Sequence, residues 1–77
     1  MTITVLFFGV LSEVAGTGTR FYNDVKNLDD LALRIADDYP SMVHYSYRVS
    51  VNNEIANGNI SLKNGDEVAF LPPFAGG

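Results

Sequence analysis

Residues 64–73 read Asn-Gly-Asp-Glu-Val-Ala-Phe-Leu-Pro-Pro. The Asn64-Gly65 pair is a tight-turn signal, because both residues tolerate the positive φ that such turns require. Residues 67–71 then alternate between two sets of side chains, as β-strands do. Pro72-Pro73 ends that strand, because proline cannot donate a ladder hydrogen bond. The stretch therefore predicts a turn, a strand and an abrupt stop before a short tail.

More strand patterns precede this one. Residues 2–8 alternate cleanly and predict a strand, with Ile3, Val5 and Phe7 on one face and Thr2, Thr4, Leu6 and Phe8 on the other. Residues 19–22 and 47–52 predict two further strands. A segment around Ile60 and Leu62, between the Asn57-Gly58 and Asn64-Gly65 turn signals, is a candidate for a fifth.

One main helix is expected between these strands. Asn27 has the character of an N-cap, and Asp29 and Asp30 follow in the first turn, where carboxylates are favourable. Helical spacing then places Leu28, Leu31, Ala32, Ile35 and Tyr39 on one apolar stripe. Pro40 ends the helix. The order predicts an α+β fold, a mixed sheet of four to five strands packed on one main helix.

Composition narrows the classes of function. The 77 residues include no cysteine and one histidine, so a cysteine nucleophile and a thiolate metal site are excluded, and no metal site is expected. The net charge of −4 disfavours binding to nucleic acid and favours a partner with a basic surface. The apolar runs are too short to span a bilayer, and no signal-peptide pattern opens the chain. We expect a cytoplasmic protein without membrane contact.

The tail is the most informative segment. It reads Pro72-Pro73-Phe74-Ala75-Gly76-Gly77. The prolines favour a stiff, extended departure from the sheet, and Phe74 is a large apolar group with no core of its own. Because Gly76 and Gly77 have no side chains, this end fits a narrow channel that leads to another protein's active site. A carboxylate delivered there can attack the α-phosphorus of ATP to form an acyl-adenylate, which a sulfur donor converts to a thiocarboxylate.

The chain resembles the ubiquitin-like sulfur-carrier family, which includes the small subunit of molybdopterin synthase. The resemblance covers essentially the whole chain. It is carried by residues 5–8 (Val-Leu-Phe-Phe), residues 13–16 (Glu-Val-Ala-Gly), residues 51–53 (Val-Asn-Asn), residues 64–73 and the final Gly76-Gly77. The carrier of the thiamine pathway shares the Gly-Gly end but usually lacks the Pro-Pro pair. Ser12 departs from the family pattern, which often has a basic residue there and so a charged contact with a partner.

The resemblance implies a ubiquitin-like β-grasp fold, with residues 1–77 forming a single sulfur-carrier domain with a flexible C-terminal tail at 72–77. It implies that Gly77 is adenylated by an E1-like enzyme that uses ATP, with no cofactor bound to this chain, and then becomes a thiocarboxylate. It also implies that the tail enters the large subunit of molybdopterin synthase in a heterotetramer. That subunit holds the catalytic residues, so this chain is not itself an enzyme.

Strand alternation predicts a docking surface without reference to the family. The helix can cover only one face of the sheet, so Leu6, Phe8 and Leu71 face away from it. An apolar patch beside the tail is typical of an interface. Phe8, Ile55, Leu71 and Phe74 are therefore the expected partner-binding residues.

Two alternative functions remain open. One is a sulfur carrier for another product, thiamine or a sulfur-containing amino acid. The other is a ubiquitin-like modifier that joins Gly77 to lysines. Other features have simpler explanations: His44 stands alone in an expected loop, and the adjacent pairs Asp29-Asp30 and Asp37-Asp38 suit helix capping and solvation.

Overall fold

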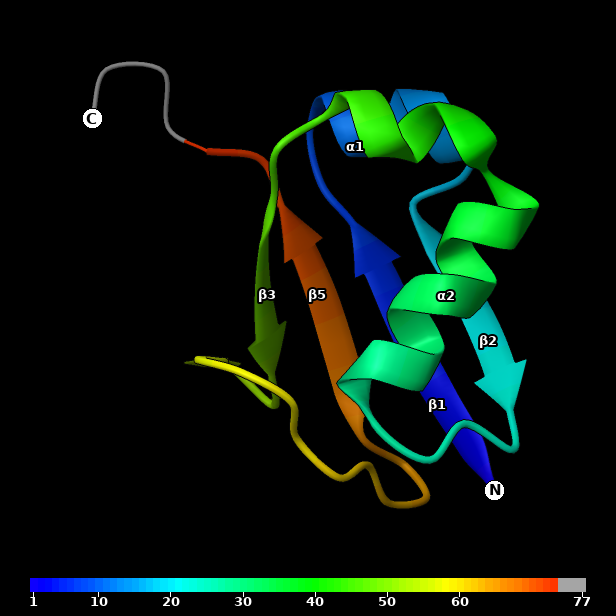
Figure 1. Cartoon of the computed structure of the whole chain (residues 1–77), viewed down its shortest axis with the longest axis vertical. Coiled ribbons are helices and arrows are strands. Elements are labelled where there is room, and N and C mark those ends of the chain that lie inside the picture. Colours follow the sequence, from blue (N-terminus) through cyan, green and yellow to red (C-terminus); the bar gives the residue numbers. More distant parts are fainter. Residues whose placement is uncertain (74–77) are drawn as a thin grey trace.

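The computed structural model describes residues 1–73 and contains one five-stranded sheet with one main helix (Figure 1). The elements in chain order are β1 (Thr2–Phe7), α1 (Val10–Ala15), β2 (Thr19–Asn23), α2 (Leu28–Asp38), the 3-10 helix η1 (Pro40–His44), β3 (Arg48–Val51), β4 (Glu54–Ile55) and β5 (Glu67–Leu71). Within the described residues, no helix is long and apolar enough to cross a membrane.

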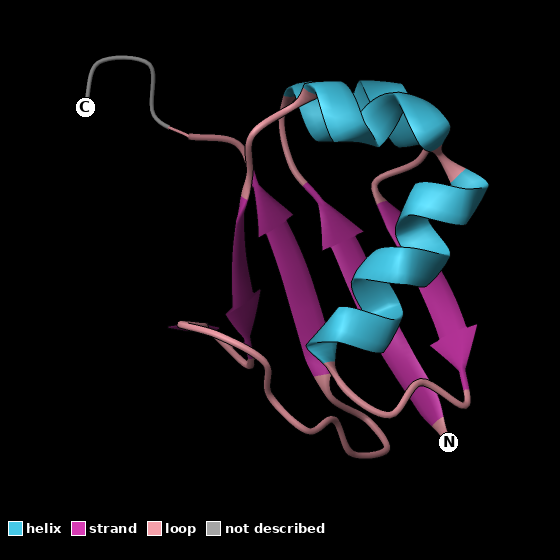
Figure 2. Ribbon diagram, viewed as in Figure 1, coloured by secondary structure: helices cyan, strands magenta, loops and turns pink. Residues whose placement is uncertain are grey.

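The sheet has the strand order β2-β1-β5-β3-β4, so the first and last strands of the chain are neighbours at its centre. β1 pairs with β5 in parallel, whereas the β1–β2, β3–β5 and β3–β4 pairs are antiparallel. Figure 2 shows α2 lying across one face of this sheet. We call the other face the open face. The mixed sheet on one helix confirms the predicted α+β class.

α2 forms where the sequence predicts it. The Asn27 side chain accepts a hydrogen bond from the Asp30 backbone N–H at 2.8 Å, which satisfies one of the donors left free at a helix start. Leu28, Leu31 and Ile35 are buried on its inner side. The helix ends before Pro40, which starts η1 instead of the expected loop.

The core lies between α2 and the inner face of the sheet. Its members are apolar side chains from every layer, with Met42 of η1 closing one end: Ile3, Val5, Phe7, Leu11, Tyr22, Val25, Leu28, Leu31, Ile35, Met42, Leu62, Val68 and Phe70. Phe70 is 1% exposed and its ring packs against Phe7 and Tyr47, with centroids 5.6 and 5.0 Å apart. Ile3, Val5 and Phe7, which the alternation of residues 2–8 placed on one face, all lie in this core.

The fifth strand is not where the sequence placed it. β4 is Glu54–Ile55 and forms a hairpin with β3 through Asn52-Asn53, whose φ angles are +49° and +71°. Asparagine tolerates this left-handed conformation because its short polar side chain bonds locally. The segment around Ile60 and Leu62 makes only a single bridge, from Ser61 to Asn27. The prediction of a strand there was wrong.

Asp66 fastens the turn before β5 to the hairpin after β3. Its carboxylate accepts hydrogen bonds from the Lys63 backbone N–H at 2.7 Å and from Asn52 Nδ2 at 3.0 Å, and its residue is 8% exposed. The Asn52 side-chain oxygen in turn accepts from the Glu67 backbone N–H. The hydrogen bond from Lys63, and then that from Asn52, hold the pKa of Asp66 below its ordinary value.

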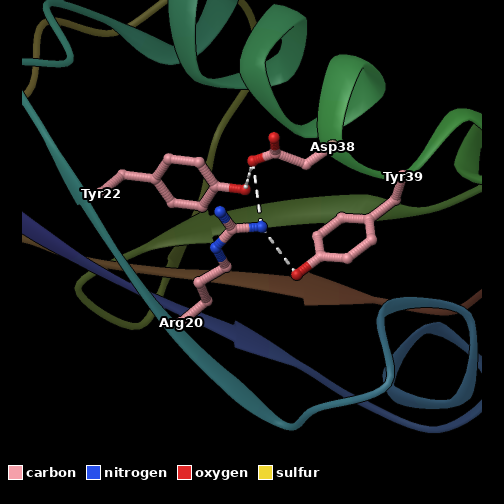
Figure 3. Close-up of polar contacts among 4 residues, drawn as sticks. All are labelled: Arg20, Tyr22, Asp38 and Tyr39. Atoms are coloured by element: carbon pink, nitrogen blue, oxygen red, sulfur yellow. Dashed lines mark hydrogen bonds and ion pairs between the residues drawn. The ribbon is translucent and has the colours of Figure 1, made fainter.

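A second polar cluster joins β2 to the end of α2 (Figure 3). Arg20 Nη1 lies 3.0 Å from Asp38 Oδ2 and donates to the Tyr39 hydroxyl at 2.9 Å. The Tyr22 hydroxyl donates to the same Asp38 oxygen at 2.7 Å, and the Arg20 guanidinium also lies over the Tyr22 and Tyr39 rings. Burial, followed by the bond to Asp38, raises the pKa of Tyr22. The cluster therefore links β2 to the C-terminal end of α2.

Replacing Asp66 tests the turn. We expect Asp66→Asn to lower the free energy of unfolding at neutral pH by about 1.5–3 kcal/mol, because the charge is lost and one of the two acceptor oxygens is replaced by an NH2 group that faces a donor. The folded pKa of Asp66 is depressed, so its charge contributes stability above the unfolded-state pKa, and this contribution disappears as the pH falls through the folded-state pKa. The difference in unfolding free energy between Asp66→Asn and the native chain, measured by urea unfolding, must therefore become smaller as the pH is lowered.

Asp37→Asn is the matched control, because Asp37 is exposed on α2. It should leave the stability nearly unchanged. Equal losses of stability in the two variants would contradict the role of Asp66 in the turn. So would a loss in Asp66→Asn that does not change with pH.

Candidate functional site

The base of the tail lies at the end of the sheet where α1 begins. β5 ends at Leu71, and the half-buried Pro72 lies against Gly9, which follows β1. A Cβ atom built on Gly9 would be 3.0 Å from Pro72 Cγ, tighter than ordinary van der Waals contact. Gly9 also has a φ of +57°, which glycine adopts readily. The proline ring therefore occupies space that the glycine leaves open.

The backbone around Gly9 is held from the α1 side. The Gly9 carbonyl accepts hydrogen bonds from the Ser12 backbone N–H at 3.1 Å and from Ser12 Oγ at 2.7 Å. Leu11 donates to the Phe8 carbonyl at 3.1 Å. Ser12 thus fixes the turn against which Pro72 packs.

Three side chains form a row across the open face at this end. Phe8 lies one residue beyond β1, and its backbone N–H donates to the Phe70 carbonyl at 3.1 Å, which continues the parallel pairing. Leu71 pairs with Arg48 of β3. Phe8 is 45% exposed, Leu71 is half-buried and Arg48 is exposed. An apolar pair with one cation at its side therefore lies directly before the tail.

Ile55 lies in the neighbouring row. It pairs with Ser50, which pairs with Ala69, which in turn pairs with Leu6. Ser50 and Ala69 are buried and Ile55 is 46% exposed. Ile55 also borders a groove of about 380 Å³ at the edge of the sheet, which the start of α2, β3 and residues 55–58 enclose. Asp29 and Arg48 are the charged residues that line this groove.

Phe21 extends the apolar character of the open face to the opposite edge. It pairs with Thr4, which is on the open face, and it is 63% exposed. Phe21 was not among the residues predicted to bind a partner. Its neighbours Arg20 and Tyr22 lie on the other face of the strand, and because Tyr22 is buried, Phe21 must face outward. The open face therefore has exposed apolar side chains at both edges of the sheet.

The tail base, formed by Phe8, Gly9, Leu71 and Pro72, is an apolar surface with few reactive groups. Phe8, Gly9, Leu71 and Pro72 have no titratable side chain, and Arg48 is the cation beside them. Within residues 1–73, no three His, Asp or Glu side chains gather as a metal site would require. The base of the tail is therefore a largely apolar surface with one cation beside it.

The predicted site residues divide between the two parts of the chain. Phe8, Leu71, Pro72 and Pro73 meet at the tail base or directly follow it, and Ile55 lies in the next row. Phe74, Ala75, Gly76 and Gly77 lie outside the described residues. The partner-binding and tail assignments remain predictions. His44, which received no function, ends η1.

Comparison with known proteins decides the family. A model described as the ThiS family matches residues 5–77. The chain belongs to the ThiS family. Two relatives of this ThiS-family chain are molybdopterin synthase sulfur carrier subunits. The protein from Mycobacterium tuberculosis is 36% identical, covering 97% of this chain and 96% of the relative. The protein from Chlamydomonas reinhardtii is 34% identical over all of both chains.

Solved structures agree with this assignment. SAMP1, the small archaeal modifier protein 1 of Haloferax volcanii, matches with a TM-score of 0.84 and 25% identity over all of both chains. The complex of subunits 1 and 2 of the molybdopterin-converting factor from Helicobacter pylori contains a chain that matches with a TM-score of 0.75 and 25% identity, again over all of both chains. The ubiquitin-like β-grasp fold expected from the sequence is confirmed.

Two adjacent phenylalanines test the assignment of faces. Phe7 is 3% exposed and Phe8 is 45% exposed. We expect Phe8→Asp to change the free energy of unfolding by no more than about 0.5–1 kcal/mol, as surface substitutions do. Phe7→Asp should cost about 3 kcal/mol or more, because a core ring is lost and a charge is buried. Urea unfolding measures both, and similar losses from the two variants would refute the assignment.

Proposed function

We propose that this ThiS-family chain is the sulfur carrier subunit of a molybdopterin synthase. The observation that carries the proposal is the match, over 97% or more of this chain, to two proteins with that role. The Pro-Pro exit from β5 and the Gly-Gly end support it, because they suit a tail that delivers its terminal carboxylate into a partner's active site. The sulfur is used for the dithiolene of molybdopterin.

The chemistry takes place on the carboxylate of Gly77. One carboxylate oxygen attacks the α-phosphorus of ATP within an E1-like activating enzyme, and pyrophosphate leaves to give the acyl-adenylate. Sulfide supplied by a sulfur donor then attacks the carbonyl carbon, and AMP leaves with the bonding electron pair. The product carries sulfur in place of one oxygen. The chain supplies the reacting group and its delivery, and the partner enzymes supply the catalytic residues.

The docking surface is the open face next to the tail. Phe8 and Leu71 form its apolar centre, Arg48 adds a cation at its side, and Ile55 extends it into the next row. Phe74 of the tail is proposed as a further contact from the sequence alone. Burying an exposed phenylalanine provides the kind of aromatic anchor on which binding energy concentrates. The solved complex of two subunits that contains a relative supports a large subunit as the partner. We propose two copies of each subunit in the assembled synthase.

A modifier function is the second candidate. The full-length structural match to a small archaeal modifier protein favours it, because a modifier uses the same activated Gly-Gly end. The two functions differ in the final acceptor. A carrier ends as a free thiocarboxylate, whereas a modifier ends in an amide bond to a lysine side chain.

Intact-mass measurement separates these outcomes. We expect incubation with ATP, the cognate activating enzyme and a sulfur donor to increase the mass by about 16 Da, the difference between sulfur and oxygen in the activated acyl group. Omitting ATP should abolish the increase. Removing Gly77 should abolish it as well, since the remaining end is too short for the activating site.

A chain that remains unchanged, under conditions that convert a known carrier, would contradict the carrier proposal. Covalent attachment to lysines of other proteins without an accumulated thiocarboxylate would support the modifier instead. Addition of the large subunit and a pterin precursor should then return the carrier to its original mass as the sulfur is transferred.

A further inference from the structure

The sequence contains two Asn-Gly pairs in different structural surroundings. Asn57-Gly58 follows β4, and Asn64-Gly65 precedes β5. In such a pair, the glycine backbone nitrogen can approach the asparagine side-chain carbon Cγ, because glycine has no side chain to obstruct the ring closure. The two pairs therefore have the same intrinsic capacity for deamidation, and any difference between them comes from the fold.

Thr2 holds both reacting groups of the second pair. The Asn64 side-chain oxygen accepts a hydrogen bond from the Thr2 backbone N–H at 2.8 Å. The Gly65 backbone N–H donates to the Thr2 carbonyl at 2.8 Å. The turn is closed further by the Asp66 backbone N–H, which donates to the Lys63 carbonyl at 3.0 Å. The nucleophilic nitrogen and the side chain it would attack are thus fixed in separate hydrogen bonds.

The first pair is not restrained in this way by any residue that the structure describes. Asn57 and Gly58 are both exposed. Within residues 1–73, no hydrogen bond engages the Asn57 side chain or the Gly58 backbone N–H. The neighbouring Asn59 shows the contrast, because its side-chain oxygen accepts from the Asp29 backbone N–H at 2.9 Å. Asn57 is therefore free to rotate its amide towards the next backbone nitrogen.

We propose that Asn57 is a site of spontaneous deamidation in the folded protein and that Thr2 protects Asn64 from the same reaction. Hydroxide removes the Gly58 amide proton, and the nitrogen attacks Asn57 Cγ. The new N–Cγ bond forms, the Cγ–Nδ2 bond breaks, and ammonia leaves after taking a proton from water. Water then opens the resulting succinimide at either carbonyl, which leaves aspartate or isoaspartate at position 57.

The reaction places a new carboxylate on a surface groove. Asn57 and Gly58 line the 380 Å³ groove together with Ile55, Asp29 and Arg48. Modification makes the chain one charge more negative than its formal −4 and adds a second carboxylate beside the single arginine of the groove. The isoaspartate product also lengthens the backbone at the edge of the sheet. The modification is independent of the sulfur-carrier proposal, because it needs only water and the folded chain.

Peptide mapping of the aged protein tests the proposal. The folded full-length chain is kept in mildly alkaline buffer, digested with trypsin and analysed by mass spectrometry. Cleavage after Arg48 and Lys63 separates the two pairs, because Asn57 lies in peptide 49–63 and Asn64 begins peptide 64–77. We expect a gain of about 1 Da, from an amide becoming an acid, to accumulate in the first peptide. Its rate should exceed that in the second by about tenfold or more, because the Thr2 hydrogen bonds must open before Asn64 reacts.

Two controls identify the residue and the cause. Asn57→Gln should remove the gain from peptide 49–63, which also contains Asn52, Asn53 and Asn59. In concentrated urea the two peptides should react at similar rates, because Thr2 no longer holds Asn64. Equal rates in the folded chain would overturn the proposal. A mass gain in peptide 49–63 that persists in Asn57→Gln would also overturn it, as would deamidation of Asn64 that remains slow in urea.

Discussion

The parallel pairing of β1 with β5 at the centre of the sheet is the contact on which the arrangement of the tail depends. It joins the two ends of the chain, so that the residues after β1 and the residues after β5 leave the sheet at the same end. The inner faces of both strands supply core side chains, including Val5 and Phe70, which are at most 1% exposed. The tail is therefore tied to the most buried part of the molecule.

The same pairing gives the carrier its two surfaces. Alternation along β1 places Phe7 in the core and Phe8 on the open side, while Pro72 packs against Gly9. The base of the tail at Pro72 is thus held close to the apolar residues that would bind a partner. In the proposed function, one docking event both recognises the partner and aims the Gly-Gly end, and the chain needs no catalytic group of its own.

Most of the secondary structure could be predicted from the sequence where the periodicity of apolar side chains was strong. The strands around Val5 and Val68, the Asn27 cap and the stop at Pro40 all follow from local rules. The β3–β4 hairpin was missed because Asn52-Asn53 turns the chain without glycine, and the predicted strand near Ile60 was wrong because apolar spacing alone does not provide a pairing partner. The bonds of Asp66 and the contact of Gly9 with Pro72 join residues far apart in sequence, and no local pattern predicts such contacts.

The most direct test of this account is the affinity of the large synthase subunit for three forms of the chain. Calorimetric titration should show that Phe8→Asp weakens binding on the order of tenfold or more relative to the native chain, as loss of an aromatic anchor does. Leu33→Asp is the matched control, because Leu33 is 71% exposed on α2, on the opposite side of the sheet, and it should bind like the native chain. Native affinity for a folded Phe8→Asp chain, or an equal loss with Leu33→Asp, would contradict docking through the open face.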